Sequence, residues 1–229
     1  MSKVIAFSIW GDNPAFVDGF LANLPLAARY YPGWTVRIYC DERIPEEAYR
    51  RIYTSGATVY NRISPSPAAW DGLFWRFEPA FDKGVEIFIS RDCDSRLNPR
   101  EAAAVNEWVQ MGFPFHSMRD HYQHIVPMLG GMWGCRSSPM FAQHLAAWAR
   151  RSNKGDDQVF LKDKIWPIVR PQCLVHDKYT VDTVVQTDHG PWTYKPTEFF
   201  GQQILRPFPE HEPLDPAIHG AHVGARVGL

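Results

Sequence analysis

The sequence predicts a single α/β domain with a mostly parallel central sheet flanked by helices. Short apolar segments alternate with segments of helical periodicity through the first half of the chain, which is the βαβ pattern of a parallel sheet. The length of 229 residues suits one domain, and no internal repeat or long linker divides it. Hydrophobic residues make up 45% and charged residues 21%, so we expect an ordinary globular core.

The first unit of this pattern lies at the start of the chain. Residues 3–9 are an apolar run, which predicts a buried strand that ends at a turn over 10–14. Residues 14–30 begin with a proline and carry apolar side chains on one face, so they predict a helix. A proline and a glycine stop this helix, and a second strand follows over 35–40.

The next elements are shorter. A proline and two glutamates open a predicted helix over 45–53, and a third strand is expected over 57–60. Alternating serines and prolines predict a loop at 64–67, and a further helix is expected over 71–81.

The strongest buried-strand candidate lies in the middle of the chain, at residues 85–90 (VEIFIS). A helix over 99–111 and a strand over 114–118 follow it. Residues 126–135 then hold the glycine-rich stretch VPMLGGMWGC.

The last third of the chain predicts two helices, over 139–151 and 157–165, and a strand over 173–176. Beyond this strand the regular pattern fades. We therefore place the domain at residues 1–205 and treat residues 206–229, rich in Pro, Gly, His and Ala, as a loosely ordered C-terminal tail.

Composition excludes several classes of protein. The net charge of −1, without a basic block, predicts no nucleic-acid partner. The four cysteines are widely spaced, which indicates free or buried thiols in a reducing compartment. No segment reaches the roughly 18 apolar residues that span a bilayer, and the N-terminus lacks a cleavable signal. We expect a cytoplasmic protein with no transmembrane segment.

Two acidic residues follow the VEIFIS strand. Asp92 and Asp94 are separated by one residue, just past the carboxyl end of a strand in a parallel sheet, where ligands of open α/β folds bind. Carboxylate oxygens suit a hard divalent cation such as Mg²⁺ or Mn²⁺, which commonly bridges to phosphate. The alternative interpretation is a solvated turn in which an aspartate caps the next helix.

Residues 85–97 (VEIFISRDCDSRL) resemble the Asp-x-Asp segment of GT-A glycosyltransferases, in which a hydrophobic strand brings the motif to a nucleotide diphosphate. Residues 116–136 look like a segment shared by bacterial and viral glycosyltransferase-like proteins of uncharacterised polysaccharide loci. The resemblance spans about residues 3–203. It implies a single GT-A (Rossmann-like) domain that uses Mn²⁺ or Mg²⁺ to transfer a sugar from a UDP- or GDP-sugar to a glycan or small-molecule acceptor, in polysaccharide or glycan synthesis.

The resemblance also implies a set of metal ligands. Asp94 matches the aspartate that usually binds the metal directly, and Asp92 matches the one near the ribose and the metal's waters. His176, at the end of a late strand, resembles a third ligand that several GT-A families supply from the C-terminal region. A structural histidine with its hydrogen bonds satisfied is the alternative for His176.

Residues from the first half of the chain are expected at the donor. By resemblance, Ser8, Trp10 and Asp12 follow the first strand, where the family binds base and ribose. Arg76 lies where related families place a basic residue that reaches the nucleotide sugar. A surface arginine is the alternative for Arg76, although a guanidinium suits phosphate.

The glycine-rich stretch supplies further donor candidates. Gly130 and Gly131 let backbone approach a ligand closely, and Trp133 can stack on a sugar ring. The alternative is a tight turn with Trp133 in the core. Asp120 is a candidate acceptor for hydrogen bonds from donor hydroxyls.

Asp156 and Asp157 open a predicted helix, where a carboxylate serves as a cap. GT-A enzymes frequently place an acidic residue at such a helix start. By resemblance, one of the two is the catalytic residue, either as a general base or as a group that holds the donor sugar.

Two other functions remain open. A sugar nucleotidyltransferase would carry a glycine-rich basic loop after the first strand, and the sequence SIWGDNP lacks it. A non-catalytic carbohydrate- or nucleotide-sugar-binding protein could share the fold. The sequence does not indicate the base, the sugar or the acceptor.

Overall fold

The central sheet is built from strands of both halves of the chain. The computed structural model describes residues 2–64, 70–149, 151–187, 190–201 and 203–227. In these residues the main sheet has eight strands, and their spatial order is β10 (Ile204–Arg206), β7 (Cys173–Asp177), β5 (Phe115–Arg119), β6 (Met132–Arg136), β4 (Val85–Arg91), β1 (Ser2–Ile9), β2 (Trp34–Asp41) and β3 (Thr58–Arg62). All neighbouring strands pair in parallel except β6, which runs antiparallel to β4 and β5. The predicted mostly parallel sheet is confirmed.

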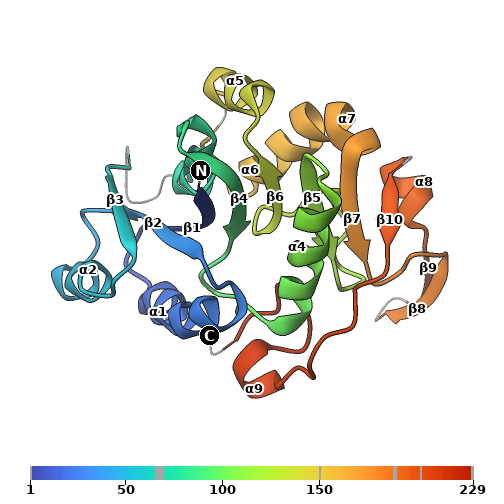
Figure 1. The fold of residues 1–229 in the computed structure, drawn as a ribbon, viewed down its shortest axis with the longest axis horizontal. Helices are drawn as coiled ribbons and strands as arrows, with labels where there is room; N and C mark the ends of the chain where they lie inside the picture. The colour runs from blue at the N-terminus through green and yellow to red at the C-terminus, as the bar shows by residue number, and fades with distance from the viewer. Residues whose placement is uncertain (1, 65–69, 150, 188–189, 202, 228–229) are drawn as a thin grey trace.

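Helices cover both faces of this sheet (Figure 1). One layer contains α1 (Pro14–Tyr30), α2 (Glu46–Tyr53) and α4 (Pro99–Met111), and the other contains α3 (Gly72–Trp75), α5 (Pro139–Ala147), α6 (Asp156–Phe160) and α7 (Trp166–Val169). Side chains of β1 alternate between the layers: Val4 belongs to the second layer's apolar cluster and Ile5 to the first's. A strand buried on both faces explains why β1 reads as a continuous apolar run.

The order of the strands creates a switch point between β1 and β4. The chain runs outward from β1 through β2 to β3, then returns to β4 on the other side of β1. The connections after β1 and β4 therefore diverge, which opens a crevice at the carboxyl ends of these two strands.

Three helices differ from the prediction. The helix predicted over 139–151 ends at Ala147. The segment predicted as one helix over 71–81 is split into α3 and a 3-10 turn, Glu78–Phe81, because Pro79 lacks the N–H that would continue the helix. The helix predicted over 157–165 begins at Asp156 and continues through a π-helical turn, Leu161–Ile165, into α7. Of the loop predicted at 64–67, residues 65–67 lie outside the described residues.

Regular structure continues past residue 176, where the sequence pattern fades. The hairpin of β8 (Thr183–Thr187) and β9 (Gly190–Tyr194) and the helix α8 (Pro196–Phe200) precede β10, which pairs with β7. These elements are short, so their periodicity gives little signal.

Residues 206–227, expected from the sequence to form a loosely ordered C-terminal tail, pack against the rest of the chain. The short helix α9 (Pro216–His219) lies against α1, where the Tyr30 hydroxyl is 3.0 Å from His219 Nε2. Val223 is buried with Ala104, Met118 and Met132. Long-range packing therefore holds a segment whose composition suggests disorder.

In the part of the chain that the structure describes, helices are too short or too polar to cross a membrane.

Candidate functional site

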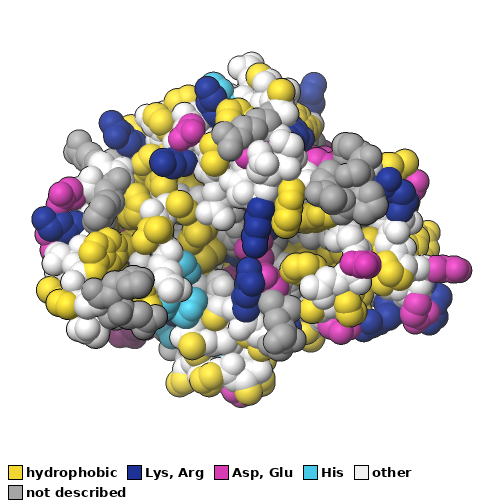
Figure 2. Space-filling view, turned by 180° about the vertical axis from the view of Figure 1, so that it is seen from behind, with side chains coloured by type: hydrophobic (Ala, Val, Ile, Leu, Met, Phe, Trp, Pro, Cys, Tyr) yellow, Lys and Arg dark blue, Asp and Glu magenta, His cyan; other side chains and the backbone are white. Residues whose placement is uncertain are grey.

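A cavity of about 530 Å³ opens at the switch point, beside the carboxyl ends of β1 and β4. Its walls come from the turn after β1, the Asp-x-Asp segment after β4, the glycine turn before β6 and the start of α6. Its volume lies within the range of small-molecule sites. Figure 2 shows acidic and basic side chains gathered near the centre of one face of the molecule, with apolar side chains around them.

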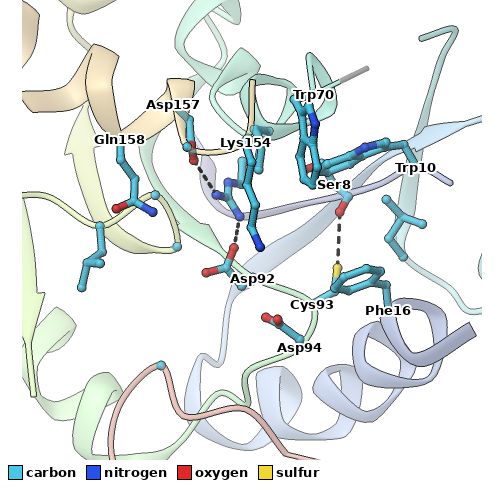
Figure 3. A pocket seen from close by; sticks show the side chains of 18 of the residues that line it. Ser8, Trp10, Phe16, Trp70, Asp92, Cys93, Asp94, Lys154, Asp157 and Gln158 are labelled. Carbon is cyan, nitrogen blue, oxygen red and sulfur yellow. Dashed lines mark hydrogen bonds and ion pairs between the residues drawn. The ribbon is translucent and has the colours of Figure 1, made fainter. Parts of the chain in front are cut away.

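Asp92 and Asp94 directly follow β4, and both line the cavity, where they form its floor (Figure 3). Their side chains differ in exposure, at 43% for Asp92 and 13% for Asp94. Burial and the neighbouring charge of Asp92 raise the pKa of Asp94. The pair therefore concentrates negative charge that a cation would relieve.

Arg76 links this floor to α6. Its buried guanidinium forms ion pairs with Asp92 and, over 2.9 Å, with Asp157; both appear as dashed lines in Figure 3. Burial opposes the charged form of Arg76, but the two carboxylates together raise its pKa. Burial raises the pKa of Asp157.

The two glycines leave room for this network. A Cβ on Gly131 would lie 3.0 Å from the Asp92 backbone nitrogen and closer still to its carboxylate. A Cβ on Gly130 would collide with Asp157 and lie 2.6 Å from Arg76 Nη2. Both glycines line the cavity, so here the backbone approaches protein carboxylates closely.

Aromatic side chains form another wall. Trp10 and Trp70 meet edge to face, with ring centroids 6.2 Å apart, and both line the cavity. Ser8 and Asp12, from the same strand end as Trp10, also line it. The Ser8 hydroxyl is buried and has no hydrogen-bond partner among the described residues, so it is available to a ligand.

The cavity is also lined by Trp70, Lys154 and Gln158, which no sequence pattern had singled out. Lys154 extends into it (Figure 3) and forms no ion pair or hydrogen bond with the residues that the structure describes. It lies immediately before the Gly-Asp-Asp segment at the start of α6, and that position was the available signal.

Trp133 does not face the cavity, so its expected stacking role is wrong. It has 0% exposure and packs among Phe77, Phe88 and Phe141. Trp133 belongs to β6, which runs between β4 and β5. Its side chain therefore points into the core on one face of the sheet and not toward the cavity at the carboxyl ends of the strands. The alternative interpretation, a core tryptophan, holds.

Asp120 and Asp156 are also displaced from their expected roles. Asp120 accepts hydrogen bonds from Arg100 and from the Val223 backbone N–H, so its carboxylate holds the C-terminal segment. Asp156 accepts from the backbone N–H groups of Ser152 and Asn153 and caps the turn before α6. Neither lines the cavity, whereas Asp157 does.

His176, expected as a third metal ligand, does not line the cavity. It is completely buried, with Nδ1 2.8 Å from His116 Nε2 and Nε2 3.1 Å from a Glu107 oxygen. Its strand is separated from β4 by β5 and β6. Among the described residues, no group of three or more His, Cys, Asp or Glu side chains is arranged to hold a metal.

The sheet between two helical layers, with acidic residues after β4 at the switch point, defines a GT-A-like α/β fold. This fold is shared with glucosyl-3-phosphoglycerate synthase from Mycobacterium tuberculosis, solved with phosphoglyceric acid, at 13% identity and a TM-score of 0.50 over 77% of this chain and 69% of that one. A glycosyltransferase involved in glycosylation of the major capsid of PBCV-1 is 13% identical, with a TM-score of 0.49 over 78% of this chain and 83% of that one. At 13% identity, the likeness to glucosyl-3-phosphoglycerate synthase shows the fold alone.

Another solved structure is similar to this chain. It is 4-diphosphocytidyl-2C-methyl-D-erythritol synthase from Anaerococcus prevotii, 9% identical with a TM-score of 0.49 over 77% of this chain and 88% of that one. No protein-family model matches the chain, and no curated protein matches it in sequence.

Proposed function

We propose that this protein is a glycosyltransferase that binds a UDP- or GDP-sugar together with Mn²⁺ or Mg²⁺ and transfers the sugar to an acceptor hydroxyl. The observation that carries the proposal is the convergence, in one cavity at the switch point, of an acidic pair, a lysine and an aromatic wall. A nucleotide-diphosphate sugar offers a flat base, two phosphates and a polyhydroxylated ring, which match these three features.

Asp92 and Asp94 would hold the metal. Two carboxylates from the protein, completed by water and phosphate oxygens, suit a hard cation that is bound together with its substrate. Burial, followed by the neighbouring charge of Asp92, raises the pKa of Asp94, and a bound cation would offset both effects. When bound, the metal supplies positive charge that stabilises the diphosphate leaving group.

Lys154 and the tryptophans bind the remainder of the donor in this proposal. The Lys154 ammonium contributes a second positive charge toward the diphosphate. Trp10 and Trp70 offer flat apolar faces to the base or the sugar. The Ser8 hydroxyl, which has no hydrogen-bond partner among the described residues, donates to a ribose or base oxygen.

Asp157 serves to position the donor. Its Oδ2 already accepts from Arg76, and its side chain is almost fully buried. A general base must instead present a free oxygen to the acceptor hydroxyl. We assign Asp157 the role of fixing Arg76 against the donor sugar.

Calorimetry with UDP and GDP, in EDTA and in Mn²⁺, tests the donor and the metal together. Binding that requires Mn²⁺ in the wild type and is lost in Asp94→Asn supports the proposal. Asp18→Asn, which removes an exposed carboxylate paired with Arg51, is the matched control and should bind normally. Equal affinity for the nucleotide in EDTA and in Mn²⁺ would show that binding does not require the metal.

Turnover separates the remaining alternatives. Slow hydrolysis of a UDP- or GDP-sugar to free nucleotide diphosphate is expected of a transferase without its acceptor. A binding protein would bind the same donor with no release. A nucleotidyltransferase would instead release pyrophosphate from a nucleoside triphosphate and a sugar phosphate.

A further inference from the structure

Arg226, from the C-terminal segment, reaches the acidic floor of the cavity. Its Nε lies 3.0 Å from Asp94 Oδ2, and Arg226 and Gly224 both line the cavity wall. Arg226 is 132 positions from Asp94, so only the packing of the C-terminal segment brings them together.

Backbone contacts place Arg226 there without using its side chain. The Val227 N–H donates to the Asp94 carbonyl over 3.1 Å, and Arg96 donates to the Val227 carbonyl over 3.0 Å. The Val223 N–H donates to Asp120. The segment is therefore held on both sides of Arg226 by bonds that a change of the Arg226 side chain leaves in place.

The side chain itself is free to move. Arg226 is 68% exposed, whereas the Asp94 carboxylate is 13% exposed. An exposed arginine forms a weak ion pair that solvent and other cations readily exchange. A divalent cation on the Asp94 carboxylate would compete for the same negative charge and repel the guanidinium, so the binding of one cation weakens the binding of the other.

A bound diphosphate gives the displaced guanidinium a new partner. The cavity that holds the acidic pair is the same cavity that Arg226 lines, so an anion bound to a metal there lies within reach of a flexible arginine. Guanidinium groups bind phosphate oxygens with two parallel hydrogen bonds.

Resting on the function proposed above, we infer that Arg226 is an exchangeable counter-ion: it occupies Asp94 in the free protein and transfers to the donor diphosphate when the metal binds. The exchange links the two ligands. A metal that binds alone must displace Arg226, so Arg226 lowers the affinity for the metal. A diphosphate that binds with the metal offers Arg226 a new partner, so Arg226 raises the affinity for the diphosphate.

Titration of Mn²⁺ alone, and of UDP and GDP at saturating Mn²⁺, tests the exchange by calorimetry in Arg226→Gln. Mn²⁺ should bind about two- to fivefold more tightly than to the wild type, because its competitor is gone. The nucleoside diphosphates should bind about tenfold more weakly or worse, because a charged phosphate contact is lost. Effects of opposite sign are not expected from a merely structural residue.

Two further variants complete the design. Arg226→Lys keeps the charge without the forked geometry and should show both effects in reduced size; it also carries the test if Arg226→Gln fails to fold. Arg51→Gln removes an exposed arginine paired with Asp18 and should change neither affinity.

Unchanged or weaker Mn²⁺ binding in Arg226→Gln, or unchanged diphosphate binding, would overturn the exchange while the proposed function stands. A wild-type protein that binds no Mn²⁺ would remove the metal from the proposed function, and the exchange with it.

Discussion

Arg76 and Asp157, 81 positions apart in the sequence, form a 2.9 Å ion pair that is buried at the wall of the cavity. Arg76 follows α3 and Asp157 lies in the first turn of α6, so the pair joins the two elements across the site. The same guanidinium also holds Asp92. One arginine therefore sets the positions of both carboxylates.

Arg76→Ala should lower the free energy of unfolding by about 3 kcal/mol or more, because it leaves two carboxylates without their buried cation. Urea unfolding monitored by tryptophan fluorescence measures this loss. Arg50→Ala, which removes an exposed arginine paired with Glu47, is the control and should cost less than about 1 kcal/mol. Equal losses in the two variants would show that the Arg76 network contributes no special stability.

Asp94→Ala should abolish metal-dependent nucleotide binding and donor hydrolysis without unfolding the protein. A partly buried carboxylate beside another carboxylate, paired only with the exposed Arg226, contributes little to stability before a metal binds, so the melting temperature without ligand should stay the same or rise slightly. Melting and hydrolysis measured on the same preparation check this. A destabilised but active variant would contradict the assignment of Asp94 to the metal.

Gly131→Ala should disturb the site more than the fold. The added methyl group collides with the Asp92 carboxylate and approaches its backbone, so Asp92 must move away from Arg76. We expect Mn²⁺-dependent nucleotide binding to weaken about tenfold or more. Gly84→Ala, whose methyl group meets only the side chain of Asp82, is the control and should bind normally. Normal binding in Gly131→Ala would mean that the position of Asp92 is unimportant.

Substitution of Trp133 and of Trp70 should distinguish a tryptophan of the core from a tryptophan of the binding site. Trp133→Ala is expected to cost about 3–5 kcal/mol of stability, because it empties a fully buried position. Trp70→Ala should cost less and weaken nucleotide-sugar binding, because Trp70 lines the cavity. Chemical denaturation and calorimetry on both variants decide the matter, and a stable Trp133→Ala with impaired binding would reverse the two roles.

His124 should make the fold sensitive to acid. Burial, followed by the charges of His222 and His121, lowers its pKa to about 3, from an ordinary value of 6.5. Its Nδ1 accepts hydrogen bonds from the backbone N–H groups of Asp120 and His121, which requires an unprotonated nitrogen. Between these two pKa values the unfolded chain binds the proton and the folded chain does not. Stability should therefore fall as the pH decreases from about 6.5 toward 3, by at most about 1.4 kcal/mol per pH unit for this group.

His124→Asn keeps an acceptor and removes this titration. Urea unfolding at pH 7 and pH 5 should show a shallower loss in the variant than in the wild type. Identical losses would indicate that His124 protonates in the folded protein as readily as in the unfolded chain.

Much of the fold was predictable because each parallel strand reads as a local apolar run. Lys3–Ile9 and Val85–Ser90 lie within β1 and β4, and the alternation of strands with helices was enough to indicate a parallel sheet between helices. The position of Asp92 and Asp94 at the switch-point edge also followed from the strand that precedes them. The metal and the donor stay predictions.

The parallel sheet and the position of the acidic pair follow from local sequence, since both depend on side chains that are neighbours along the chain. The partners of that pair depend on the packing of distant segments, because Arg76 and Arg226 reach Asp92 and Asp94 from segments that periodicity does not connect. The same packing placed Trp133 in the core, enclosed His176 with His116 and Glu107, and packed the C-terminal segment against the cavity. Burial is a property of how the layers meet, and a residue's type alone does not specify which layer its side chain will face.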